Sequence, residues 1–205
     1  MAKLDRAFYL QDNVVNVARQ LLGCKIVTMF NGERTAGIIV DTEAYKGITD
    51  RASHAFNNRR TNRTEKMYLE GGYAYVYLVY GLHHLFNVVT NQQNHPDGVM
   101  LRAIEPVEGI DVMLKRCGKT KLDYSLTNGP GSLSKALGIT VQNAGEDLTG
   151  NLIWIEKNNK TLPNSAVMIT TRVGVNYAGD DAYLPYRFYI KDNPYRSKAK
   201  GLPLP

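Results

Sequence analysis

The sequence has few of the features that mark several large protein classes. Its 205 residues include only two cysteines, Cys24 and Cys117, and neither stands in a Cys-x-x-Cys pair or a Cys/His cluster. This scarcity argues against a disulfide framework and a zinc site, and it indicates a reducing, intracellular compartment. The sequence holds no apolar run of membrane-spanning length, and its N-terminus lacks the apolar segment of a secretion signal. We therefore expect a soluble cytoplasmic protein that does not bind a membrane.

Nucleotide-binding and metal-binding motifs are missing as well. The sequence has neither the Gly-x-Gly-x-x-Gly pattern of dinucleotide-binding proteins nor the Gly-Lys-Ser/Thr ending of a P-loop, which disfavours a dehydrogenase or a kinase. His83 and His84 are adjacent rather than one helical turn apart, and His95 lies in a predicted turn. We expect no metal and no cofactor.

What the sequence does contain is an excess of positive charge on a chain of single-domain length. The 25 lysines and arginines exceed the 19 acidic residues, so the net charge is +6 and the pI is about 9.2. This balance favours a polyanionic partner, although many basic proteins bind nothing acidic. We find no repeat or linker and expect one domain over residues 1–205, of which 191–205 form a mobile basic tail.

The hydrophobic pattern predicts a mixture of helices and strands. The predicted helices are one capped by Asp12 and ended by Gly23, one from Pro106 to near Gly118, and one from Pro130 to Gly138. The predicted strands are 36–45, 73–80, 85–89, 99–104, 152–156 and 166–175.

The tract from Tyr73 to Gly81 is the most informative feature. Tyr73, Tyr75 and Tyr77 share one face of the predicted strand, whereas Tyr80 has the opposite parity and precedes Gly81, so its ring should project from the strand end. A row of rings can stack on a base taken out of a duplex, and a projecting ring can fill the gap left behind. The alternative is that the tyrosines simply fill the core of a strand.

Two charged residues lie within apolar strands. Glu43 should face the same way as Tyr45, and Arg102 lies inside Val99–Ile104. Because isolated buried charges are unfavourable, we expect the two to lie close together or to share a water molecule. The guanidinium would then keep the carboxylate ionised and ready to accept a proton from water. The alternative is a structural ion pair, or two side chains that reach solvent separately.

A polar loop between residues 50 and 65 carries His54 and a run of basic and amide side chains. Arg59, Arg60 and Arg63 in this loop are suited to contacting phosphates, although a solvated polar loop is the alternative. The segment Asn128-Gly129-Pro130-Gly131 could also bind a phosphate at a helix start, but ordinary helices begin the same way.

Taken together, the motifs resemble the alkyladenine (3-methyladenine) DNA glycosylase family. The resemblance extends from about Ala18 to Pro194 and is carried by the order and spacing of several segments. They are Asp41-Thr42-Glu43-Ala44-Tyr45, His54, Tyr75–Gly81, Asn87, Leu101–Pro106, Asn128-Gly129-Pro130, Arg172–Val175 and Pro185–Tyr189.

The resemblance implies a fold and a set of roles. The implied fold is a single α+β domain with a curved, mainly antiparallel β-sheet surrounded by α-helices. By this resemblance, Glu43 is the general base that activates water, and Arg102 and the main chain of Val173 help to place that water. Tyr45 and Tyr77 lie on either side of the extracted purine, and His54 and Asn87 lie beside it. Tyr80 is the side chain that wedges into the duplex. Double-stranded DNA with damaged purines is the implied partner. We expect a monomer associated with the nucleoid.

Chemistry supports this assignment independently. Breaking an N-glycosidic bond develops positive charge on the sugar, so one carboxylate can stabilise that charge and deprotonate the incoming water. An electron-poor alkylated purine stacks well on tyrosine rings. Deaminated purines such as hypoxanthine would need protonation, and the sequence indicates no residue for that step.

Two other functions stay open at this point. A non-catalytic module could stack unpaired bases of a single strand on the tyrosines without using Glu43. A hydrolase of free nucleosides could use the same carboxylate, but it would leave the arginine-rich loop without a role.

Overall fold

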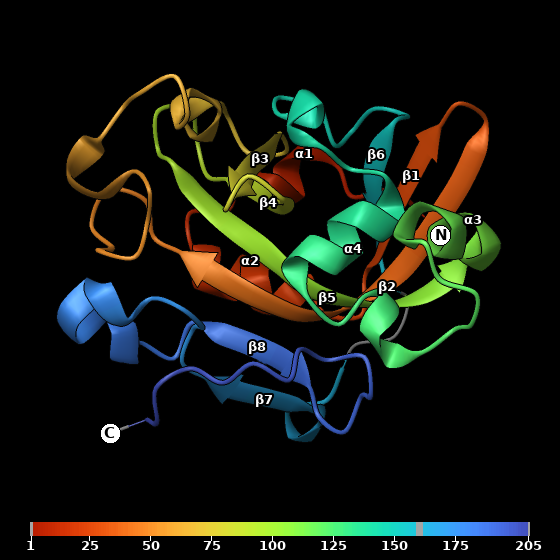
Figure 1. Cartoon of the computed structure of the whole chain (residues 1–205). Coiled ribbons are helices and arrows are strands. Elements are labelled where there is room, and N and C mark those ends of the chain that lie inside the picture. The colour runs from red at the N-terminus through yellow and green to blue at the C-terminus, as the bar shows by residue number, and fades with distance from the viewer. Residues whose placement is uncertain (1, 159–161, 205) are drawn as a thin grey trace.

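A computed structural model of the chain describes residues 2–158 and 162–204 (Figure 1). The helices are α1 (Arg6–Tyr9), α2 (Val14–Gln20), α3 (Ile110–Cys117) and α4 (Pro130–Leu137), joined by several short 3₁₀ turns. The strands are β1 (Lys25–Phe30), β2 (Glu33–Tyr45), β3 (Ala74–Val79), β4 (His83–Thr90), β5 (Asp97–Glu108), β6 (Ile153–Glu156), β7 (Val167–Thr170) and β8 (Arg187–Ile190).

The strands form one eight-stranded antiparallel sheet centred on β2. The main order is β3-β4-β5-β2-β1-β6, and β8 pairs both with β2 and with β7. The 13-residue strand β2 therefore pairs with β5 along one edge. Along its other edge it pairs first with β1 and then with β8. Figure 1 shows the long strands β2 and β5 crossing the molecule, with β7 and β8 beneath them and helices packed around the sheet. The expected single α+β domain is confirmed.

The pairing of β2 with β5 is irregular near the middle. Ile39 pairs with Ile104, Asp41 with Ala103 and Thr42 with Leu101, so the register omits Val40 on one strand and Arg102 on the other. Such β-bulges bend a strand and redirect a side chain. The strict alternation predicted for 36–45 is therefore interrupted at Val40, opposite the position of Arg102 on β5.

Beyond the bulge, β2 presents two chemically different faces. The hydroxyl of Thr42 donates to the carbonyl of Ala18 in α2 at 2.8 Å, so Thr42 faces that helix. Glu43, the next residue, points away from α2 because side chains alternate along a strand.

Two predicted helix starts need correction. The cap of α2 is Asn13, whose side chain accepts from the backbone N–H of Asn16, rather than Asp12. Pro106 does not open a helix: it pairs with Gly37 beside a register shift in β5, and α3 begins only at Ile110. Proline is tolerated at such a position because a bulge interrupts the hydrogen-bond ladder.

The strand predicted for 166–175 ends early, at Thr170. Arg172 and Val173 instead belong to a non-strand segment that approaches the end of β2. The ends of α3 and α4 near Gly118 and Gly138 agree with the prediction, and both glycines have left-handed backbone conformations.

The segment from residue 191 onward contacts the sheet. Ser197 is buried, its N–H donates to Asp41 at 3.1 Å, and Arg187 donates to the carbonyls of Ser197 and Ala199. The backbone carbonyl of Leu202 accepts from Thr171. The mobility expected for this tail stays a prediction, but its backbone has specific partners in the structure.

Candidate active site

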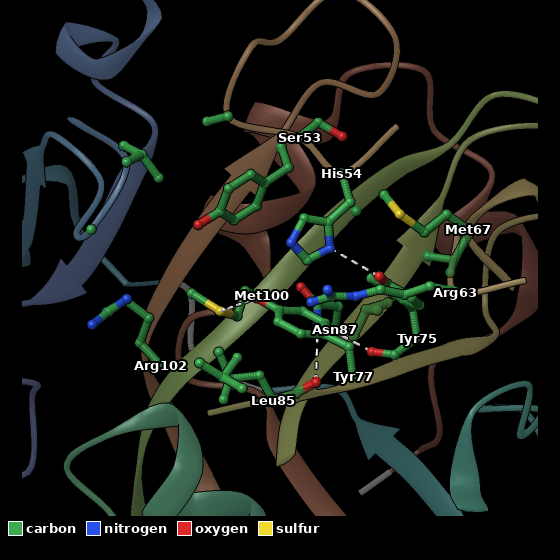
Figure 2. A pocket seen from close by; sticks show the side chains of 18 of the residues that line it. Ser53, His54, Arg63, Met67, Tyr75, Tyr77, Leu85, Asn87, Met100 and Arg102 are labelled. Carbon is green, nitrogen blue, oxygen red and sulfur yellow. Dashed lines mark hydrogen bonds between the residues drawn. The ribbon is translucent and has the colours of Figure 1, made fainter. Parts of the chain in front are cut away.

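A cavity of about 440 Å³ opens beside the ends of β2, β3 and β5. Its walls also include residues of β4, of the loop 52–67 and of the segment 173–177. Figure 2 shows the aromatic, amide and basic side chains that project into it. The lining residues predicted from the sequence are Tyr45, His54, Arg63, Tyr77, Tyr80, Asn87, Arg102 and Val173.

Glu43 lies directly behind this cavity and is fully buried. One carboxylate oxygen accepts from the backbone N–H of Val173 at 2.8 Å and lies 3.2 Å from Nη1 of Arg102. The other accepts from the hydroxyl of Tyr45 at 2.8 Å. The predicted proximity of Glu43 to both Tyr45 and Arg102 is confirmed, and the three partners of the carboxylate all line the cavity.

The charges around Glu43 stabilise one another. Burial acts to lower the pKa of Arg102, but the carboxylates of Glu43 and Asp41 outweigh it, so the pKa is raised. The pKa of Tyr45 is well above its ordinary value because the ring is buried and its hydroxyl faces the Glu43 carboxylate. Tyr45 is therefore a neutral hydrogen-bond donor, and the buried Nε of Arg102 has no hydrogen-bond partner among the described residues.

A second buried ion pair supports Tyr45 from behind. Arg172 is fully buried, forms a two-point contact with the carboxylate of Asp50, and donates to the carbonyl of Ala44 at 3.0 Å. Its guanidinium carbon lies 4.9 Å from the centre of the Tyr45 ring. Because Val173 is the next residue, this pair positions two of the groups that contact Glu43. Sequence analysis missed this role; the available signal was Arg172 alone, a charge at the end of a predicted apolar strand.

The tyrosine strand forms the opposite wall with His54. The rings of Tyr75 and Tyr77 lie 5.4 Å apart, and His54 meets Tyr77 edge-on at 4.6 Å. Nδ1 of His54 lies 2.9 Å from the hydroxyl of Tyr75 (Figure 2). Burial, with the nearby charges of Arg63 and Arg59, lowers the pKa of His54 to about 4, so His54 is neutral at pH 7. Tyr73 lies apart from this wall and stacks on Arg6.

The floor of the cavity is fixed by cross-strand contacts. Asn87 is paired with Tyr75 on one side and with Met100 on the other. Its amide nitrogen donates to the carbonyls of Tyr75 and Leu85 at 3.1 and 3.3 Å. The amide is therefore held in one orientation. Met100 was not predicted; it is buried and contacts the hydroxyl of Tyr77 through its sulfur.

Tyr80 stands at the rim, at the tip of the hairpin between β3 and β4. Its side chain is 90% exposed, as the parity argument predicted. Tyr80 and Gly81 have φ of 52° and 70°, and the N–H of Leu82 donates to Val79 across the turn. A left-handed backbone is uncommon for an aromatic residue, and strain of this kind gathers at functional sites.

The three loop arginines have different surroundings. Arg60 pairs with the exposed carboxylate of Glu65 and donates to Asn94, and Arg59 is exposed. Arg63 instead reaches the cavity, where its guanidinium carbon lies 5.2 Å from the centre of the Tyr77 ring. Like the other two arginines, Arg63 is exposed to solvent, so the loop carries one cation at the open wall of the cavity and two away from it.

A further acid at the cavity wall was not predicted. Asp97 begins β5, is mostly buried, and accepts from the side chain of Asn91 at 3.1 Å. Burial raises its pKa to about 6.

Within residues 2–158 and 162–204, no group of three or more His, Cys, Asp or Glu side chains could hold a metal ion, and no helix is long and apolar enough to cross a membrane.

Comparison with known proteins agrees with this geometry. Residues 7–194 match the family described as "Methylpurine-DNA glycosylase (MPG)". A protein of Bacillus cytotoxicus is 42% identical over 198 residues, which are 93% of this chain and 97% of that protein. Proteins of Bacillus cereus (strain AH187) and Bacillus anthracis (strain CDC 684 / NRRL 3495) are each 44% identical, with 94% of this chain and 97% of each relative covered. All three are named "Putative 3-methyladenine DNA glycosylase".

The site and the match together define a class of base-excising enzyme. The chain belongs to the methylpurine-DNA glycosylase family, so the resemblance inferred from its motifs is confirmed. The expected enzyme class, DNA-3-methyladenine glycosylase, is confirmed at the level of the family.

Proposed function

We propose that this chain is a monofunctional glycosylase that flips alkylated or deaminated purines out of duplex DNA and hydrolyses the N-glycosidic bond, leaving an abasic site. The observation that carries the proposal is the Glu43 carboxylate, held by Arg102, Tyr45 and the N–H of Val173 at the back of an aromatic cavity. A structural ion pair would not need an adjoining cavity lined by tyrosines.

In the proposed reaction, Glu43 acts as general base for a water molecule. The water oxygen forms a bond to C1′ of the deoxyribose while the bond from C1′ to the purine nitrogen breaks. Glu43 takes up the water's proton, and the purine leaves with the bonding electron pair. The negative charge of Glu43 also stabilises the positive charge that develops on the sugar. The free Nε–H of Arg102 is available to hold the water.

The remaining predicted residues take up the nucleotide and the duplex. Tyr45 and Tyr77 stack on the extracted purine, and His54 and Asn87 contact it from the side and floor of the cavity. Tyr80 enters the duplex at the place that the purine has left, since its ring is already exposed at a hairpin tip. Arg59, Arg60 and Arg63 contact the backbone of double-stranded DNA, which the monomeric enzyme meets at the nucleoid.

The direct test is base release from duplex DNA that carries one defined damaged purine. Wild-type protein should release the base, and Glu43→Gln should lower the single-turnover rate by at least about 10³-fold, because the amide cannot accept the water's proton. The change leaves Arg102 without its buried counter-ion, so thermal unfolding must show that the variant is folded.

A second variant keeps the test informative if Glu43→Gln unfolds. Tyr80→Ala leaves the carboxylate untouched and should preserve the unfolding midpoint while it slows excision. Equal release by wild type and folded Glu43→Gln would remove Glu43 from the mechanism. Tight binding of undamaged single strands without base release would favour the non-catalytic module instead.

A further inference from the structure

Tyr177 is an exposed aromatic residue at the mouth of the cavity. It is 70% exposed, yet it forms part of the cavity wall. Among the described residues, Tyr80 and Tyr177 are the two exposed tyrosines of this wall, whereas Tyr45 and Tyr77 are partly buried. The two exposed rings mark the open side of the cavity: one is on the hairpin between β3 and β4, and the other is on the 3₁₀ turn Asn176–Tyr183.

The position of Tyr177 is fixed by packing and by a hydrogen bond. Its neighbour Ala178 is fully buried and belongs to a small hydrophobic cluster with Ala52 and Val175. The hydroxyl of Tyr177 donates to the backbone carbonyl of Ala52 at 3.2 Å, which joins the turn to the loop that forms another wall of the cavity. Burial raises the pKa of Tyr177, so its hydroxyl end lies inside although the residue as a whole is mostly exposed.

The segment that carries Tyr177 also carries the group that orients Glu43. The backbone N–H of Val173 donates to Glu43 at 2.8 Å. The next residue, Gly174, is exposed and lines the cavity, and a Cβ at this position would meet open space. In the proposed reaction Glu43 directs water to C1′, so the deoxyribose must lie at the mouth of the cavity, beside this open segment.

We propose that the ring of Tyr177 packs against the deoxyribose of the extracted nucleotide and holds C1′ within reach of the water that Glu43 activates. This inference rests on the function proposed above and adds a sugar contact to the base contacts of Tyr45 and Tyr77. The C–H groups of a deoxyribose are apolar, so covering an exposed aromatic ring with them removes apolar surface from water.

A purely structural role for Tyr177 leads to different expectations. If Tyr177 only ties its turn to Ala52, the hydroxyl matters and the ring does not. If the ring packs against the sugar, the ring matters and the hydroxyl contributes less. A sugar contact also persists when the base is absent, because an abasic site keeps its deoxyribose ring.

The experiment measures equilibrium binding of an undamaged duplex and of the same duplex with one tetrahydrofuran abasic-site analogue. Tyr177→Ala should weaken binding of the tetrahydrofuran duplex by about tenfold, the effect of truncating a tyrosine at the centre of an interface. Its affinity for the undamaged duplex should stay close to that of wild type. Tyr177→Phe keeps the ring and should lose no more than about threefold, the effect of one neutral hydrogen bond.

Tyr183→Ala is the matched control from the same turn. Tyr183 is also exposed, at 44%, but it is not one of the residues that line the cavity, so both affinities should match wild type. Thermal unfolding must show that Tyr177→Ala is folded. If it is not, Tyr177→Leu takes its place, because leucine keeps apolar bulk but removes the flat ring.

Wild-type affinity of folded Tyr177→Ala for the tetrahydrofuran duplex would overturn the inference. Equal losses in Tyr177→Phe and Tyr177→Ala would also overturn it, because the hydroxyl rather than the ring would then be responsible. Both results leave the glycosylase function intact when wild type releases a damaged purine. Failure of wild type to release any damaged purine would instead refute the function, and the inference with it.

Discussion

At the scale of single residues, the carboxylate of Glu43 is fixed by donors from three separate segments. Tyr45 is on the same strand, Arg102 comes from a bulge in β5, and Val173 comes from the segment after β7. Each donor limits the rotation of the carboxylate, so its orientation is set before any substrate binds. In the reaction proposed above, such preorganisation lowers the reorganisation needed in the transition state. It also explains why a fully buried acid tolerates the loss of water around it.

The neutral state of His54 leads to a prediction about stability and pH. The pKa of His54 is about 4 in the folded protein and near 6.5 in an unfolded chain, so the unfolded chain binds the extra proton first as pH falls. Folding stability should therefore be complete above about pH 6.5 and decrease as pH falls toward 4, by on the order of 3 kcal/mol. Urea unfolding of wild type and His54→Gln between pH 8 and pH 4 measures this, and the variant should show the shallower decline.

Asp97 provides an internal control for that measurement, because its sign is opposite. Its pKa is raised to about 6, so the folded protein holds the proton longer than the unfolded chain does, and stability should fall as pH rises from about 3.8 to 6. Asp97→Asn should remove this opposing effect and make the acid-side decline steeper.

Identical stability profiles of wild type and His54→Gln against pH would contradict the His54 prediction and show that His54 titrates normally.

At the scale of elements, sequence patterns predicted the strands that carry the site but not all of their contacts. The period of two placed Glu43 on the same face as Tyr45, and the cost of burying a single charge placed Arg102 with Glu43, because neither inference needs the register between strands. The bulge at Arg102 could not be predicted, since it depends on the register of two strands about 60 residues apart in sequence. The same holds for Arg172, whose partner Asp50 is distant in the chain.

The Arg172–Asp50 pair links a loop to the segment that contacts Glu43, so its loss should act on both. Asp50 also accepts from the backbone N–H groups of Lys46 and Ala52. Asp50→Asn leaves Arg172 charged, buried and without a counter-ion, and should lower the free energy of unfolding by about 3–5 kcal/mol. Chemical denaturation measures this loss, and base release should fall as the support of Tyr45 and Val173 loosens.

Glu65→Gln is the matched control for this change. It also removes one carboxylate from an arginine pair, but both members of the Arg60–Glu65 pair are exposed to solvent, so the unfolding midpoint should hardly move. A similar, small effect of both substitutions would mean that water reaches Arg172 and that the pair does not fix the segment.

At the scale of the whole molecule, the C-terminal segment packs behind β2, the strand that carries Glu43. Composition predicted a mobile tail there, because lysines and prolines replace the hydrophobic pattern. The contacts that hold the segment use backbone atoms, which composition does not reveal. Ser197 and Ala199 supply carbonyls to the buried Arg187, which in turn pairs with Asp41 two residues before Glu43.

Removal of residues 195–205 therefore tests whether this segment is a tail or part of the fold. Truncation removes two hydrogen-bond acceptors of Arg187 and one hydrogen-bond donor to Asp41. Each hydrogen bond to a charged group contributes about 1.5–3 kcal/mol to stability. Since the ordering entropy of the segment is regained, the net loss should be on the order of 2–3 kcal/mol by urea unfolding. The double variant Lys198→Ala, Lys200→Ala removes two exposed charges but keeps the backbone contacts, and should unfold like wild type. If the truncated chain matches wild type instead, the segment is the mobile tail that its composition predicts, and Asp41 and Arg187 suffice to hold this end of β2.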